Sequence, residues 1–369
     1  MTRYLLLSVA VISLSMPASA HHGFGRFIME KDVELKGVLT KLEFVNPHSY
    51  VYFNASGDDG KITEMRCEMR AATVLRRSGW SPDLFVKGAN IVITGHPHRE
   101  DPASCYVETL KIGDAPRLER YEQISAAGKA GNKDRPLRLA DGTPNIFGDW
   151  AQEQYLLITP PGEARGRLVP KSMVEPINKG EVNLADVPGP DWFPRQVTLT
   201  EPGREASAAL RNLPPDQNPR LNCQISSILF DWTFDGPVNR ITQGEGVITI
   251  EYGRGLTRTV YMNMDNHPAD ITPSRGGHSI GSWDGDTLVV DTVGFAPGIV
   301  AAIIPNSAAF HVIERFTLEP GKPALKREYV AEDPVYYTDQ YKGFDTVLVA
   351  DAPFAVDQCK ELASEYTKD

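Results

Sequence analysis

The stretch His278-Ser-Ile-Gly-Ser-Trp-Asp-Gly-Asp-Thr-Leu-Val-Val-Asp291 decides the fold class of this chain. Two alternating segments flank Asp284-Gly285, a dipeptide typical of tight hairpin turns. A two-residue turn at this dipeptide places His278 directly opposite Asp291. Opposed Cβ atoms lie about 5 Å apart, so the imidazole and the carboxylate can share a hydrogen bond. We therefore predict an antiparallel hairpin that carries a His278–Asp291 dyad.

More of the chain between residues 141 and 369 alternates in the same way. The expected strands are Arg240–Thr242, Gly246–Tyr252, Thr257–Met264, His278–Trp283, Thr287–Phe295, His311–Leu318 and Leu325–Val330. The alanine-rich segment Arg204–Asn212 follows Thr200 and Gly203, either of which can cap a helix. Successive hairpins favour a larger antiparallel β-barrel of the lipocalin type, with a β-sandwich as the alternative.

Residues 21–115 predict a separate, smaller β domain. Its expected strands are Val33–Val45, Ser49–Ala55, Ile62–Met69, Asn90–Gly95 and Cys105–Ile112, with one helix at Ala71–Ser78. Five strands with a helix after the third suggest an OB-like barrel, so the whole chain is mainly β. Residues 116–140 contain many small and charged side chains and predict a linker between the two domains.

The first twenty residues are typical of a cleavable secretory signal. Arg3 precedes the apolar run Tyr4–Leu14, and the small residues Ala18 and Ala20 flank the expected cleavage site. The run is too short for a membrane anchor. We therefore expect a periplasmic or secreted protein whose mature chain begins at His21.

The four cysteines suit such an oxidising location. Of the three possible connectivities, we favour Cys67–Cys105 and Cys223–Cys359, because each pair lies within one half of the chain. The alternative is that one or both pairs are reduced, buried thiols.

Charge and motifs exclude several classes of protein. The formal net charge of -10 repels nucleic acids and anionic lipids, so we expect neither as a partner. Neither a P-loop nor a GxGxxG dinucleotide pattern is present, which fits an exported protein that meets little nucleotide cofactor. We expect chemistry that requires no cofactor or that uses a bound metal.

Five of the eight histidines fall in the first hundred residues and form a candidate metal set. They are His21, His22, His48, His96 and His98. Imidazoles suit copper or zinc, and an N-terminal histidine adds its free amine as a second ligand for copper. The alternative is that histidines beside prolines satisfy backbone groups at strand ends.

The second half holds the candidate catalytic residues. A carboxylate such as Asp291 raises the basicity of His278, as a general base requires. Glu314 is expected to share a strand face with apolar residues, which raises its pKa unless a cation pairs with it. His267 lies in the loop before the hairpin, and Tyr337 can offer a phenol as an acid. A structural role is the alternative for each of them.

Both halves resemble exported bacterial proteins of unknown function. In the first half the resemblance rests on His21-His22-x-Phe24, Asn46-Pro47-His48 and Gly95-His96-Pro97, and covers about residues 20–115. In the second half it rests on Gly277-His278-Ser279-Ile280-Gly281-x-Trp283-x-Gly285-Asp286-Thr287-Leu288-Val289-Val290-Asp291-Thr292 and covers about residues 139–340. The resemblance implies no established activity. Relatives often carry an arginine before His267-Pro268, where this chain reads Asp265-Asn266.

These observations favour an exported, cofactor-independent enzyme of the lyase or isomerase type. Its barrel would hold an apolar or aromatic small molecule against His278 and Asp291, with Glu314 or His267 as the second proton-transfer group. Cleavage of a lignin-derived aromatic dimer is one reaction of this type. The alternative is a periplasmic protein that binds copper or a small ligand without catalysis. A serine hydrolase is disfavoured, because we expect the chain to lack a GxSxG nucleophile elbow.

Overall fold

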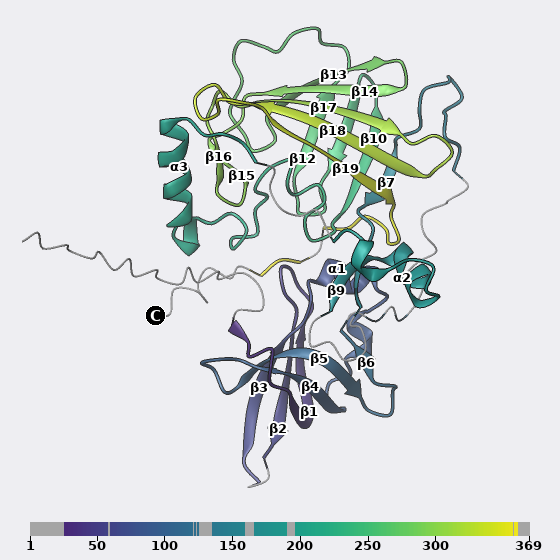
Figure 1. Cartoon of the computed structure of the whole chain (residues 1–369), viewed down its shortest axis with the longest axis vertical. Helices are drawn as coiled ribbons and strands as arrows, with labels where there is room; N and C mark the ends of the chain where they lie inside the picture. Colours follow the sequence, from purple (N-terminus) through teal and green to yellow (C-terminus); the bar gives the residue numbers. More distant parts are fainter. Residues whose placement is uncertain are drawn as a thin grey trace, which may run out of the picture.

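Two β-rich domains follow one another along the long axis of the molecule (Figure 1). The computed structural model describes residues 26–57, 60–120, 122, 124, 135–158, 166–189, 196–356 and 358–360. The expected signal segment, residues 1–20, and the histidines at positions 21 and 22 lie outside the described residues.

The N-terminal domain is a five-stranded barrel. Its strands are β1 (Val33–Glu43), β2 (Tyr50–Ser56), β3 (Ile62–Glu68), β4 (Asn90–Pro97) and β5 (Ser104–Ile112). They pair in the order β3-β2-β1-β4-β5, and a parallel pairing of β3 with β5 closes the barrel. Helix α1 (Ala72–Arg77) and a 3₁₀ turn (Pro82–Leu84) connect β3 to β4. This arrangement confirms the predicted OB-like barrel.

Alternation of side chains along these strands builds the core of the first barrel. Leu39, Val51, Phe53 and Ile93 are at most 1% exposed, while other positions on the same strands, such as Val38 and Asn54, are exposed. The predicted Cys67–Cys105 disulfide joins β3 to β5 at their parallel pairing.

The expected linker begins inside this domain. Strand β6 (Leu118–Glu119) pairs with Thr109 and Leu110 of β5, so it extends the sheet. Arg120 is buried and its guanidinium lies 4.8 Å from the ring centre of Tyr106. The chain therefore remains attached to the barrel for several residues past position 116.

The C-terminal domain is a closed barrel of nine strands, which confirms the barrel rather than the sandwich. The strands are β7 (Gly148–Ala151), β10 (Val238–Gly244), β11 (Val247–Glu251), β12 (Thr257–Tyr261), β13 (His278–Asp284), β14 (Thr287–Val293), β17 (His311–Leu318), β18 (Ala324–Glu332) and β19 (Tyr341–Val349). Strand β7 pairs with both β10 and β19 and so completes the circle.

One pairing differs from the expected antiparallel meander. Strands β12 and β13 run parallel, with Val260 opposite Ser279 and Tyr261 opposite Ile280. A parallel pair requires a long connection, and residues 262–277 provide one. This long loop contains His267.

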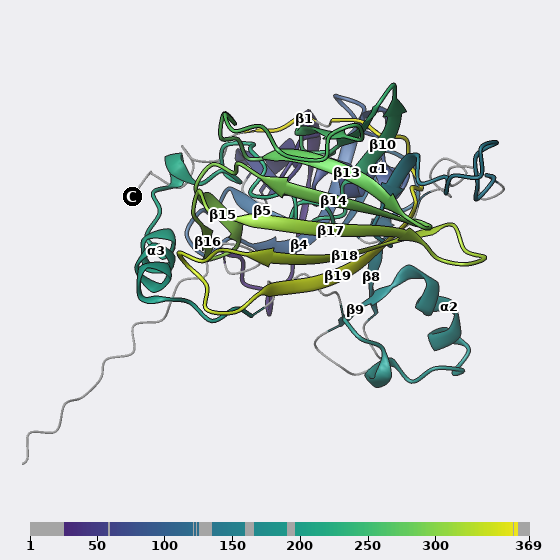
Figure 2. The ribbon, with the colours of Figure 1, turned by 90° about the horizontal axis from the view of Figure 1, so that it is seen from above.

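Smaller elements lie around the second barrel. They are the hairpin of β8 (Tyr155–Ile158) and β9 (Arg167–Pro170), α2 (Lys171–Asn178), α3 (Glu201–Arg211), the hairpin of β15 (Gly298–Ala301) and β16 (Ile304–Asn306), and 3₁₀ turns at Leu184–Asp186 and Pro215–Gln217. Figure 2 shows α3 beside β15 and β16, with α2 on the opposite side. Helix α3 confirms the predicted helix, and the Thr200 hydroxyl caps it by accepting the Gly203 N–H.

The middle of the second barrel is filled by the chain itself. Residues 225–232 contribute Trp232, which is fully buried and makes T-shaped ring contacts with Tyr252 and Phe316. Arg327 reaches this segment and donates hydrogen bonds to the carbonyl oxygens of Ile228 and Leu229. The second barrel therefore has a packed interior where a lipocalin has an open cup.

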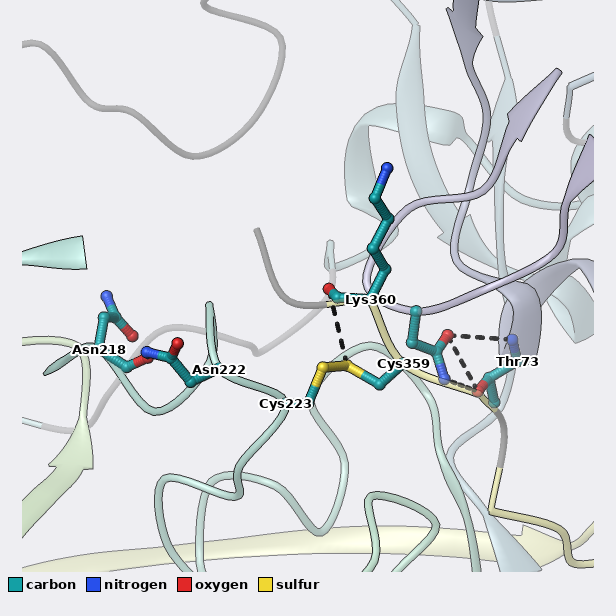
Figure 3. Close-up of a disulfide and its surroundings, with 7 residues drawn as sticks. Thr73, Asn218, Asn222, Cys223, Cys359 and Lys360 are labelled. Atoms are coloured by element: carbon teal, nitrogen blue, oxygen red, sulfur yellow. Dashed lines mark hydrogen bonds between the residues drawn. A yellow bond between two sulfur atoms is a disulfide. The ribbon is translucent and has the colours of Figure 1, made fainter. Parts of the chain in front are cut away.

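The second predicted disulfide, Cys223–Cys359, attaches the C-terminal tail to the segment that leads into the barrel (Figure 3). On both sides of Cys359 the tail pairs with the N-terminal domain, because Asn46 donates its N–H to the carbonyl of Gln358 and its own carbonyl accepts the N–H of Lys360. Two disulfides suggest an oxidising compartment. No helix within the described parts of the chain is long and apolar enough to cross a membrane.

Candidate functional site

The hairpin of β13 and β14 forms as predicted, but its turn is displaced by one residue, so the pairing register is shifted by two. The central turn residues are Gly285 and Asp286, since Asp284 already pairs with Thr287. Gly285 has φ of 59°, which suits the first central position of a tight hairpin turn. His278 is therefore opposite Val293, and Asp291 is opposite Ile280, so the predicted direct pairing of His278 with Asp291 is wrong.

The side chains of His278 and Asp291 still lie on one face of the sheet. Asp291 is opposite Ile280, and Ile280 points the same way as His278 because the two are separated by one residue on the same strand. This face is the outside of the barrel. The strand neighbours of the two residues, Ser279 and Thr292, are fully buried, whereas His278 and Asp291 are partly exposed. The dyad residues thus meet solvent and not the barrel interior, where we expected the ligand.

Histidine side chains connect these residues on the outer face. His267, from the long loop after β12, has its Nδ1 2.9 Å from Nδ1 of His278 and its Nε2 3.3 Å from Oδ1 of Asp291. His311, at the start of β17, has its Nε2 2.8 Å from the same carboxylate oxygen. We call these four residues, His267, His278, Asp291 and His311, the outer histidine cluster.

The hydrogen bonds define one consistent arrangement of protons with neutral rings. The Asp291 carboxylate accepts Nε2–H bonds from His267 and His311. His267 then accepts at its Nδ1 the Nδ1–H of His278, which leaves Nε2 of His278 as an unprotonated nitrogen. Burial lowers the pKa of His278, and the neighbouring His267 lowers it further, so the ring is mainly neutral at pH 7.

An aromatic side chain positions His278 from the other side. The ring of Tyr261 stacks on the imidazole, with centroids 5.0 Å apart and an interplanar angle of 15°. Tyr261 is 38% exposed, and Ile313 on the same outer face is 37% exposed. The cluster therefore has an aromatic and apolar border.

The other two predicted catalytic residues lie elsewhere. Glu314 is fully buried inside the barrel, where it pairs with Arg258 at 2.5 Å and with Arg327 at 3.2 Å. Tyr337 is buried, donates its hydroxyl to the carbonyl of Pro305 at 2.5 Å, and has a pKa raised by burial. Neither side chain takes part in the hydrogen bonds of the outer histidine cluster.

The described members of the predicted metal set have separate partners. His48 pairs with Glu68 at 2.9 Å. His96 is buried beside the carbonyl of Lys31, while His98 accepts backbone N–H bonds from Glu100 and Asp101. Among the residues that the structure describes, no group of three or more histidine, cysteine or acidic side chains has the geometry to hold a metal ion.

The expectation that the chain lacks a GxSxG pattern is wrong at the level of the sequence. Gly277-His278-Ser279-Ile280-Gly281 matches GxSxG, the pattern of a nucleophile elbow. In the structure, Ser279 lies inside strand β13 and faces the interior, where it bonds to Arg258 and Thr292. A nucleophile elbow requires an exposed serine on a strand-to-helix turn, so this serine is not one.

Two residues of this site were not predicted from the sequence. His311 is a member of the cluster, and Tyr261 stacks on His278 beside it. His311 begins a strand that we predicted, and alternation places it on the face opposite Val312 and Glu314. That placement was available from the sequence. Its proximity to Asp291 depends on the pairing of β14 with β17, which the sequence does not show.

Comparison with known families supports only the first half of the resemblance. Residues 9–105 match a family of unknown function, DUF6152. The match covers most of the N-terminal barrel, including Asn46-Pro47-His48. None of the curated proteins matches the chain.

Proposed function

We propose that the protein is an exported, cofactor-independent enzyme of the lyase or isomerase type, in which His278 is the general base. The observation that carries the proposal is the chain of hydrogen bonds from Asp291 through His267 to His278. Such a chain orients the imidazole and stabilises the imidazolium that forms when it accepts a proton. His311, partly exposed and also bonded to Asp291, is the second proton-transfer group.

The substrate that fits this site is a small molecule with an apolar or aromatic part. Exposed Tyr261 and Ile313 border the cluster and can contact such a group, with Tyr261 already stacked on the catalytic imidazole. A lignin-derived aromatic dimer is a member of this class. The two disulfides support a periplasmic or secreted location.

The proton arrangement can be tested without a substrate. In ¹⁵N NMR spectra at pH 7.5, we expect His278 to be neutral with its proton on Nδ1. His98 is a matched reference, because its Nδ1 accepts two backbone N–H bonds and a neutral ring must carry its proton on Nε2. A proton on Nε2 of His278 would contradict the proposal.

Catalysis can be tested by hydrogen–deuterium exchange at activated C–H bonds of a panel of aryl ketones in D₂O. A general base typically raises a reaction rate by about 10²- to 10⁴-fold, so His278→Gln should lower the exchange rate by that factor. Asp291→Asn should lower it as well, since it removes the carboxylate that orients His267. Equal exchange rates for wild type and His278→Gln, or activity that a chelator abolishes and zinc restores, would overturn the acid–base proposal.

A further inference from the structure

A cavity of about 320 Å³ lies between the two domains, where α1 and β9 approach each other (Figure 1). Pro47 of the Asn-Pro-His motif and Val74 of α1 line it from the N-terminal domain, and Tyr155, Leu168 and Phe234 line it from the other side. Its volume falls at the lower end of the range typical of small-molecule sites, which are often found where domains meet. The outer histidine cluster contributes none of its lining residues, so this cavity is a separate site.

Two aromatic side chains of the wall are held in place by their neighbours. The ring of Phe234 stacks on Phe230, with centroids 4.4 Å apart, and the Arg220 guanidinium lies 4.3 Å from the Phe234 centroid. Tyr106 is 7% exposed, and its ring contacts Phe27. Rings that are fixed before binding lose little conformational entropy when a ligand enters. Such rings favour stacked or edge-to-face contacts, so the wall favours an aromatic ligand.

Aliphatic side chains from both domains supply more of the apolar lining. Met69, Ala71 and Val74 belong to the N-terminal domain, and Leu168 belongs to β9. Removal of apolar surface from water favours binding in proportion to the area that is buried. A ligand with a largely apolar body therefore gains from contact with both domains at once.

Two polar side chains of the wall form hydrogen bonds to the protein across the domain boundary. Arg77 is 4% exposed and donates to Asp351 and to the carbonyl of Gln152, each at 2.7 Å. Gln154 donates to the carbonyl of Arg77 at 2.9 Å, and its side-chain oxygen accepts the Ser78 hydroxyl at 3.1 Å. These bonds fix the wall and already use the polar atoms that make them.

Charged side chains of both signs line the cavity in equal number. The two arginines and two carboxylates are Arg70, Arg77, Glu153 and Asp235. Asp235 pairs with Arg254 at 2.8 Å, and the lining histidine, His48, pairs with Glu68 at 2.9 Å. An ionic ligand would lose its hydration and meet charges of both signs, whereas an uncharged ligand avoids this loss. We propose that this interdomain cavity binds an uncharged aromatic small molecule.

The probe for this site is N-phenyl-1-naphthylamine, an uncharged aromatic amine whose fluorescence rises in apolar surroundings. Titration of the full-length protein should show one saturable site. Val74→Trp and Leu168→Trp each place a large side chain in the cavity, from opposite domains, and should weaken binding about tenfold or more. The control Val86→Trp, at a position that is 62% exposed and outside the lining, should retain wild-type affinity. Circular dichroism should show the same fold for all three variants.

The charge preference is tested by displacement of the bound probe with three compounds that share one ring system. They are 2-naphthalenemethanol, 2-naphthoate and 2-naphthylmethylammonium, which are neutral, anionic and cationic. The neutral compound should displace the probe at about a tenfold lower concentration than either ion, because each ion must lose its hydration in a wall without net charge.

Displacement by either ion at the same or a lower concentration would overturn the proposal of an uncharged ligand. Absence of saturable binding, or wild-type affinity in either folded cavity variant, would overturn the cavity as the site. Neither readout depends on His278, so failure here is distinct from failure of the acid–base proposal.

Discussion

Removal of the Cys223–Cys359 disulfide should destabilise the protein by up to about 5 kcal/mol. The bond closes a loop of 136 residues, and the entropy that a cross-link of this length removes from the unfolded chain corresponds to about 5 kcal/mol at 25 °C. The bond Cys67–Cys105 closes 38 residues and corresponds to about 4 kcal/mol. The longer loop should therefore have the larger effect, by about 1 kcal/mol.

The two disulfides also differ in the parts of the structure that they connect. Cys67 and Cys105 connect adjacent strands of one barrel, whereas Cys359 belongs to a tail that pairs with Asn46 of the other domain. In Cys223→Ala/Cys359→Ala we expect the amides of Asn46 and Lys360 to lose protection from hydrogen exchange. In the control Cys67→Ala/Cys105→Ala these amides should remain protected.

The assay is urea-induced unfolding of both double variants under oxidising conditions, followed by circular dichroism, together with hydrogen exchange monitored by mass spectrometry. A destabilisation below about 1 kcal/mol in Cys223→Ala/Cys359→Ala, with unchanged protection of Asn46 and Lys360, would refute the reasoning. That result would mean that the tail contacts alone secure the two domains.

Three further predictions concern the second barrel. Glu314→Gln leaves Arg258 buried without its carboxylate and should cost about 3–5 kcal/mol, measured by urea unfolding; a loss below 1 kcal/mol would contradict it. Because the folded pKa of His278 is lowered, the unfolded chain binds its proton more tightly, so stability should fall as pH drops below about 6.5; a His278→Gln variant with an unchanged pH slope would exclude this cause. Gly281→Val should prevent folding or lower Tm strongly, since a Cβ there would lie 2.6 Å from Val260 Cγ1; normal thermal unfolding would disprove the clash.

Local patterns predicted most strands, but not how distant strands meet. Alternation identified β17 and β13, because each has one buried face. The turn was misplaced by one residue, since an Asp-Gly dipeptide allows glycine at either central position. The parallel pairing of β12 with β13 has no local signal, and neither does β7, which has only four residues.

The candidate site was predictable only in part, for the same reason. Three of its residues, His267, His278 and Asp291, were chosen for their chemistry and are brought together by the fold. The side of the barrel on which they lie was not expected, because we assumed an open interior. Trp232, which fills that interior, belongs to a segment without strand or helix periodicity, so its burial depends on tertiary packing alone.

Strand β7 has a consequence for how the second domain folds. It pairs with β10 and with β19, and its contact between Trp150 and Val349 joins positions about two hundred residues apart. Contacts of such high sequence separation slow folding, and until they form both neighbouring strands present unpaired backbone edges. Barrel closure should thus be a late step, and the interval before it is when the newly made chain is most exposed to aggregation.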